Sequence, residues 1–246
     1  GTSALARVLS MLGCDLPATL MMPNETNSNG HWESDALRAF NDEVLASAGS
    51  DWADWTAFDS RWYQSPVAAR FQDRIAGLLE QEYGNSPLFV LKDPRNCRLG
   101  RLWIDGLRQV GVEPLVVMPV RNPLEVADSL AVRNAMDRAS TVLLWLRHVL
   151  DAEAASRGVR RVTCSYSQLL ENWGGLARRL EEELGLAWPR MSAITAQEVE
   201  AFISSDARHE RRSEDAILDN PLMSDWVRDT YAILMRWARD CEDPAD

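Results

Sequence analysis

The segment Pro114–Asn134, PLVVMPVRNPLEVADSLAVRN, decides the fold class of this chain. Leu115–Val120 is a short, valine-rich apolar run, which predicts a strand buried on both faces of a parallel sheet. The turn Arg121–Pro123 ends that run, and apolar residues then recur at helical spacing. Proline suits the first turn of a helix, where its missing N–H costs no hydrogen bond. The segment therefore predicts a strand, a turn and a helix within an α/β fold.

Arg121 follows the carboxyl end of the predicted strand and precedes a helix N-terminus, which is a natural place for an anion. Ser129 comes eight residues later, two helical turns and about 12 Å of rise away. The two side chains can bind one anion only if the arginine reaches along the helix, and its length allows this. A surface arginine in a capped strand–turn–helix is the alternative interpretation.

The pattern R-N-x-x-E-V-A-x-S at residues 121–129 resembles the 3′-phosphate motif of sulfotransferases that use 3′-phosphoadenosine 5′-phosphosulfate (PAPS). In that family an arginine at a strand end and a serine eight residues later bind the 3′-phosphate, and Arg121 and Ser129 match both positions. The resemblance implies a P-loop-like α/β architecture, with a short parallel sheet flanked by helices. We expect residues 1–246 to form a single domain of this kind.

Composition limits the function classes open to the chain. Its net charge of −11 makes a broad nucleic-acid-binding surface unexpected. The four cysteines are widely spaced and form no C-x-x-C pair, which favours reduced thiols over a disulfide or zinc framework. Neither a signal peptide nor a membrane-spanning apolar run is visible. We expect a cytoplasmic protein, and the sequence leaves its oligomeric state open.

Residues Gly1, Thr2 and Ser3 precede an amphipathic helical pattern. Small residues, exposed N–H groups and two hydroxyls at a helix start suit a phosphate, although serine and threonine are also ordinary N-caps. The tripeptide resembles the end of the family's 5′-phosphosulfate loop, which has the form strand–GxxRSGTS–helix. The strand and the basic residue of that loop do not occur in the sequence, so we expect the natural chain to continue upstream.

The loop-like stretch Asn24–Gly30 leads to His31, Trp32 and Glu33, before a helix predicted to start near Ser34. A capped helix start with a packing tryptophan explains these residues without any chemistry. The segment also resembles an N-x-x-G-[aromatic or His]-W-E-S segment of bacterial sulfotransferases. That resemblance implies a general base in this loop, and we favour Glu33 over His31 for the role.

Lys92 is the only lysine of the chain and follows the apolar run Leu88–Leu91, which predicts another buried strand. A codon bias toward arginine would explain the lysine shortage, but an ammonium also differs from a guanidinium at a phosphate. The turn Lys92–Arg95 resembles a K-[DST]-P-R turn beside the sulfate donor. The resemblance implies that Lys92 and Arg95 steady the transferring group; a surface turn with an Asp–Arg pair is the alternative.

Three other segments each allow two interpretations. Tyr166 ends the predicted strand Arg161–Tyr166 and either caps it or, by the resemblance, contacts the adenine. The aromatic residues of Asp51–Tyr63 either line an acceptor pocket, for a sugar for example, or pack a lid onto the core. The basic stretch Phe202–Arg212 is either a solvated face or a lid over the nucleotide, with Arg208, His209 and Arg212 as candidate contacts.

These features predict transfer of a sulfuryl group from PAPS to a hydroxyl or amine, with 3′-phosphoadenosine 5′-phosphate (PAP) as the second product and no metal. A carbohydrate or a small natural product is the favoured acceptor. One alternative is a P-loop kinase-like phosphotransferase, which needs a Gly-Lys-Ser/Thr loop and a magnesium-holding aspartate. The other is a nucleotide-binding protein without catalytic activity.

Overall fold

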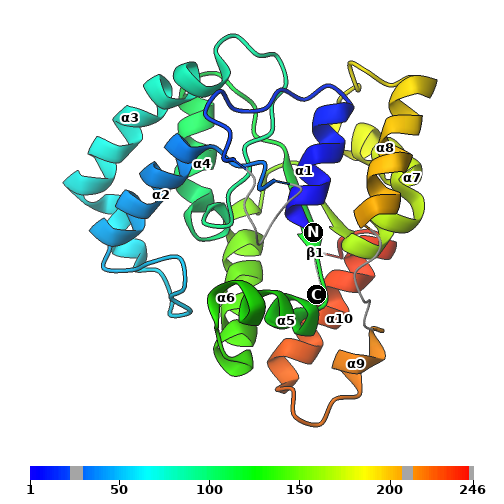
Figure 1. The fold of residues 1–246 in the computed structure, drawn as a ribbon. Helices are drawn as coiled ribbons and strands as arrows, with labels where there is room; N and C mark the ends of the chain where they lie inside the picture. The colour runs from blue at the N-terminus through cyan, green and yellow to red at the C-terminus, as the bar shows by residue number, and fades with distance from the viewer. Residues whose placement is uncertain (23–29, 207–212, 244–246) are drawn as a thin grey trace.

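Two parallel strands, β1 (Val116–Val120) and β2 (Arg161–Ser165), form the sheet of this protein. The computed structural model describes residues 1–22, 30–206 and 213–243 (Figure 1). Val116 pairs with Arg161 and Val120 with Ser165, so both strands end at the same edge of the sheet. The protein is therefore a mixed α/β protein, as predicted, with a short parallel sheet.

The chain crosses from β1 to β2 through α5 (Pro123–Asn134) and α6 (Arg138–Ser156). The N-cap of α5 is Asn122, whose side chain accepts a hydrogen bond from the Leu124 N–H at 2.9 Å. This cap and the proline after it fix where β1 ends and the helix begins. The result is that Arg121 stands at the carboxyl end of β1, as the sequence predicts.

Helices pack around the strands as three apolar clusters. The first joins α1 (Thr2–Met11), α7 (Tyr166–Leu184) and α8 (Ala193–Asp206) to β2. The second contains α2 (Asp35–Ser47), the 3₁₀ helix η1 (Ser60–Gln64), α3 (Pro66–Tyr83) and α4 (Asn96–Gln109). The third contains α5, α6, α9 (Asp215–Leu218) and α10 (Asp225–Arg239). Figure 1 shows α2, α3 and α4 on one side of β1, and α1, α7 and α8 on the other.

One predicted strand and the end of another are wrong. Leu88–Leu91 is not a strand, because among the described residues it makes only one bridge, in which Phe89 lies parallel to Asp15. The Asp15 N–H donates to the Leu88 carbonyl at 2.9 Å, and the Val90 N–H donates to the Asp15 carbonyl at 3.0 Å. One residue of pairing satisfies these groups but does not make a ladder. Tyr166, expected at the end of a strand, instead begins α7.

β1 is less enclosed than the sequence predicts. Met118 and Val120 are buried, but the other three residues of the strand are partly exposed. Within the described residues its only ladder partner is β2. As for the helices, none in this part of the chain is both long enough and apolar enough to cross a membrane.

Candidate functional site

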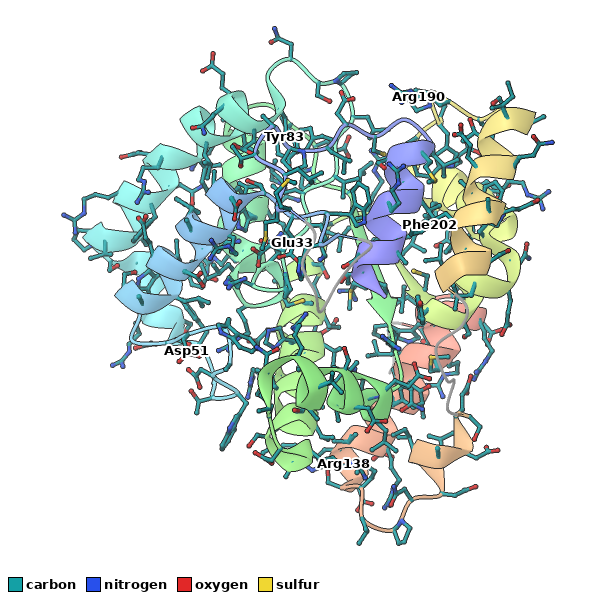
Figure 2. All side chains as sticks on the ribbon, viewed as in Figure 1. Glu33, Asp51, Tyr83, Arg138, Arg190 and Phe202 are labelled. Carbon is teal, nitrogen blue, oxygen red and sulfur yellow. The ribbon has the colours of Figure 1, made fainter. Side chains whose placement is uncertain are left out.

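Three separate segments of the chain meet at the ammonium group of Lys92. Its Nζ donates to the Ser3 hydroxyl at 3.2 Å and to the His31 carbonyl at 2.9 Å, and it forms an ion pair with the Glu33 carboxylate. The side chains of Lys92 and Glu33 are only 11% and 8% exposed. Figure 2 shows Glu33 in the interior, between α1 and the group formed by α2 and α4. We call Ser3, His31, Glu33 and Lys92 the Lys92 cluster.

The backbone at Trp32 turns so that the His31 carbonyl before it and the Glu33 carboxylate after it both contact Lys92. Its φ of 56° lies in the left-handed region, which is unusual for a residue other than glycine. The Arg7 guanidinium lies over the Trp32 ring, 4.6 Å from its centroid. After the turn, Ser34 caps α2 by accepting the Leu37 N–H at 2.9 Å, so the helix start predicted there is confirmed. Strain of this kind concentrates at functional sites.

Burial and neighbouring charges shape the electrostatics of the Lys92 cluster. Burial lowers the pKa of Lys92 from its ordinary value, while the Glu33 carboxylate opposes the shift. Burial also lowers the pKa of His31, again against Glu33. Arg133, in the last turn of α5, lowers both pKa values further. The end of α5 is therefore within electrostatic range of the cluster.

Arg121 belongs to a second group of residues, at the start of α1. Its Nε donates to Glu125 at 2.7 Å, and its guanidinium carbon lies 4.9 Å from the centroid of the Tyr166 ring. The Tyr166 ring packs against Gly1, where an added Cβ would be only 2.9 Å from a ring carbon. Gly1 is the N-cap of α1, a helix with no acidic residue in its first turn. Arg121, Tyr166 and the start of α1 are thus in contact.

The two groups meet through α1, because Gly1 touches Tyr166 and Ser3 accepts from Lys92. The structure therefore brings together most of the residues predicted for the site, namely Gly1, Ser3, His31, Glu33, Lys92, Arg121 and Tyr166. The exposed Thr2 lies between Gly1 and Ser3 in the first turn of α1.

Two other candidate residues, Ser129 and Arg95, stand apart from this assembly. Ser129 is exposed on α5, one turn beyond Glu125, and no hydrogen bond among the described residues joins it to Arg121. Arg95 pairs with Asp42 and Asp93, at 2.5 and 3.2 Å. The predicted lid contacts Arg208, His209 and Arg212 lie outside the described residues.

The sequence interpretation missed two charged residues of the site. Glu125 binds the predicted phosphate arginine, and its i,i+4 spacing from Arg121 on a predicted helix was the signal available. Arg133 acts on the Lys92 cluster from the far end of the same helix. Nothing in the local sequence distinguishes it from a surface arginine, since its relation to Lys92 depends on tertiary packing.

The aromatic segment Asp51–Tyr63 contains one tryptophan that packs into the core and one that is exposed to solvent. Trp62 is buried, lies edge-on to Phe58 at 5.7 Å, and donates its indole N–H to Ser47 at 3.0 Å. Trp62 therefore has a packing role. Trp55, in contrast, keeps 46% of its surface exposed.

Two surface cavities do not coincide with the assembly at α1. One, of about 460 Å³, lies between η1, α3 and α4, and its lining includes Tyr63 and Arg101. The other, of about 370 Å³, lies before β1 and β2, and its lining includes Arg108 and Arg160. Neither lining contains Lys92 or Arg121. In residues 1–22, 30–206 and 213–243, no three His, Cys, Asp or Glu side chains gather as a metal site would require.

No protein-family model, curated protein or solved structure matches this chain.

Proposed function

We propose that this protein is a sulfotransferase that moves a sulfuryl group from PAPS to a hydroxyl or amine of a carbohydrate or small natural product. The observation that carries the proposal is the meeting of Lys92, Ser3 and Glu33 at the start of α1, beside Arg121 and Tyr166. The residue types and their order along the chain are those that the sequence resemblance implies. A P-loop-like sulfotransferase architecture is part of the same proposal.

The start of α1 fits the phosphosulfate end of the donor. The N–H groups of the first helical turn and the positive end of the helix dipole favour an anion. Gly1 has no side chain that would block close approach, and the place that a Cβ would take is filled by the Tyr166 ring. Lys92 contributes a cation at Ser3, within the same turn. In this arrangement, Arg121 binds the 3′-phosphate and Tyr166 contacts the adenine.

Glu33 and Lys92 divide the chemical work between them. Glu33 accepts the proton of the acceptor hydroxyl or amine as that atom forms its bond to sulfur. Lys92 stabilises the negative charge that develops on the bridging oxygen when the bond between sulfur and PAP breaks. The products are the sulfated acceptor and PAP. Because the two side chains form an ion pair, an anion that draws Lys92 toward α1 also frees the Glu33 carboxylate for the acceptor.

The kinase-like alternative finds less support in these contacts. Asp93, the carboxylate next to Lys92, is bound by Arg95 through its backbone N–H at 2.7 Å and its guanidinium at 3.2 Å. It is therefore engaged in a structural role where a kinase would need a magnesium ligand. Thr2 also stands between Gly1 and Ser3, where the Gly-Lys-Ser/Thr loop of a kinase has its lysine.

A transfer assay tests the proposal. The full-length protein is incubated with ³⁵S-labelled PAPS and a panel of sugars, phenols and amines, and in parallel with γ-³²P-labelled ATP and magnesium. We expect label from PAPS to appear on at least one acceptor class, and none from ATP. Transfer from ATP alone would establish the kinase alternative. PAP binding without turnover on any acceptor would indicate a protein that only binds the nucleotide.

A further inference from the structure

Three consecutive backbone carbonyls, those of Asp54, Trp55 and Thr56, accept hydrogen bonds from two arginines. Arg98 donates through Nη1 to the Asp54 carbonyl and through Nη2 to the Thr56 carbonyl, the latter at 2.8 Å. Arg147 donates through Nε to the Trp55 carbonyl at 3.3 Å. A surface segment whose successive carbonyls are all bound by side chains is held in one conformation.

The two arginines are themselves fixed by one carboxylate. Asp151 accepts from Arg98 Nε at 2.7 Å and from Arg147 Nη1 at 3.1 Å. The Arg98 side chain is 0% exposed, and burying a charge so completely carries a desolvation cost. We call Arg98, Arg147 and Asp151 the arginine clamp. The arginine clamp thus uses a buried, charged side chain to hold a short surface segment in place.

The residue at the centre of this fixed segment presents an aromatic ring to solvent. Trp55 is 46% exposed, although its neighbour Trp62 is buried in the second apolar cluster. A ring on a fixed backbone loses little conformational entropy when a ligand stacks on it. The side chain of Asp54 adds to the rigidity by accepting from the Ser50 hydroxyl at 2.7 Å and the Thr56 N–H at 2.8 Å.

The clamp also places Trp55 relative to the proposed site. Arg98 is in the first turn of α4, and the turn that carries Lys92 leads directly into that helix. Figure 1 shows the segment after α2 passing below that helix toward α6, where Arg147 binds it. The segment around Trp55 is therefore tied to the same end of α4 as Lys92.

We propose that Trp55 is a stacking platform for a ring of the acceptor, an uncharged ring with an apolar face, from a sugar or an aryl group. The name acceptor rests on the proposed sulfotransferase function; the ring-binding property does not. Burial works to raise the pKa of Asp54, but hydrogen bonds from Ser50 and Thr56 outweigh it and lower the pKa. The carboxylates of Asp51, Asp54 and Asp151 outnumber the two arginines of the clamp, which disfavours an anionic ring.

Nuclear magnetic resonance of the indole N–H groups tests the platform without any sulfate donor. The full-length protein, ¹⁵N-labelled at tryptophan, is titrated with cellotetraose in one arm and with 4-methylumbelliferone in the other. Trp55→Phe assigns the Trp55 resonance. We expect this resonance to shift with at least one probe, and the arm that shifts it identifies a sugar or an aryl ring. A Trp55 resonance that moves with neither probe would overturn the proposal.

Variants separate stacking from general surface effects. Trp55→Ala should weaken binding of the active probe about tenfold, while Trp226→Ala, which removes a 75% exposed tryptophan on α10, should leave it unchanged. Equal affinity for Trp55→Ala and the unaltered protein would also overturn the proposal. Arg147→Met tests Arg147 as a residue that positions Trp55. It should weaken binding of the active probe without changing the affinity for PAP. Arg147→Lys should restore probe binding.

The same samples distinguish failure of the platform from failure of the proposed function. If PAP binds and Trp55 does not respond to either probe, the platform is wrong and the sulfotransferase proposal stands. If a probe shifts Trp55 and PAP does not bind, the sulfotransferase proposal falls while the platform stands as a ring-binding site.

Discussion

Two buried cations near the start of α4 are held in different ways. All three guanidinium nitrogens of Arg98 are bound inside the protein, by Asp151 and by the carbonyls of Asp54 and Thr56. Lys92 has a carboxylate, a carbonyl and the hydroxyl of Ser3, which lies in the first turn of a helix without acidic residues there. An arginine fork fixes a geometry, whereas an ammonium on a flexible stem can exchange partners. We therefore assign Arg98 a structural role and Lys92 a chemical one.

The largest expected effect is the loss of turnover in Glu33→Gln, compared with the other residues of the Lys92 cluster. Glu33→Gln should reduce turnover about 10²- to 10⁴-fold, because it removes the general base while nearly preserving the side-chain volume. PAP affinity, measured by calorimetry, should change little. His31→Gln is the matched variant. If Glu33→Gln retained turnover and His31→Gln lost it, the base would be His31.

Arg98→Met should lower the free energy of unfolding by about 3–5 kcal/mol, because it removes the fully buried guanidinium that pairs with Asp151 and binds the carbonyls of Asp54 and Thr56. Denaturant titration measures this change. Arg101→Met, on the exposed face of the same helix, should cost less than about 1 kcal/mol. A small effect of Arg98→Met would contradict the structural role of the clamp.

Lys92→Met should reduce turnover about 10²- to 10³-fold, the loss expected when a group that stabilises transition-state charge is removed. Burial lowers the pKa of Lys92, so the folded protein already disfavours its charged form, and the loss of stability should be smaller than that of Arg98→Met. Single-turnover kinetics and denaturant titration give the two quantities. Should Lys92→Met unfold the protein as readily as Arg98→Met, the contrast between the two cations would be lost.

Arg121→Ala should weaken PAP binding about 10- to 100-fold, as expected for a charged hydrogen-bonding partner of a phosphate. The affinity for AMP, which has no 3′-phosphate, should stay nearly constant. Calorimetric titration with both nucleotides measures the difference. An equal loss for PAP and AMP would move Arg121 away from the 3′-phosphate.

The smallest expected effect is the pH dependence of the unfolding free energy that arises from His148, on the same helix as Arg147 and Asp151. Burial lowers the pKa of His148, although its hydrogen bond to the Leu144 carbonyl opposes the shift. The unfolded chain therefore binds a proton first as the pH falls below the ordinary histidine pKa of about 6.5, and the folded state loses stability there. His148→Gln should flatten the fall in unfolding free energy with decreasing pH. An unchanged slope would show that His148 does not contribute.

Local signals in the sequence predicted the helix starts well. The helices predicted to start after the Arg121–Pro123 turn and near Ser34 begin where the sequence places them, with Asn122 and Ser34 as their caps, since a cap depends only on neighbouring residues. The Leu88–Leu91 strand failed because a strand depends on ladder partners distant in the sequence. For the same reason, the Arg98 clamp and the Arg133 charge were not predicted.

The predicted site residues divide along similar lines. Lys92, Glu33, Arg121 and the start of α1 each belong to a motif at a predicted strand or helix end, and the structure brings them together. Arg95 also belongs to such a motif, but its contacts are with Asp42 and Asp93. Which partner a charged side chain finds is decided by packing, and no spacing rule gives it.

Calorimetric titration of the full-length protein with PAP, AMP and ATP–magnesium tests the central claim most directly. Our account predicts micromolar binding of PAP and much weaker binding of AMP, because the 3′-phosphate gains Arg121. No preference for PAP over AMP would contradict the sulfotransferase proposal. Tight binding of ATP–magnesium in its place would favour the kinase-like alternative.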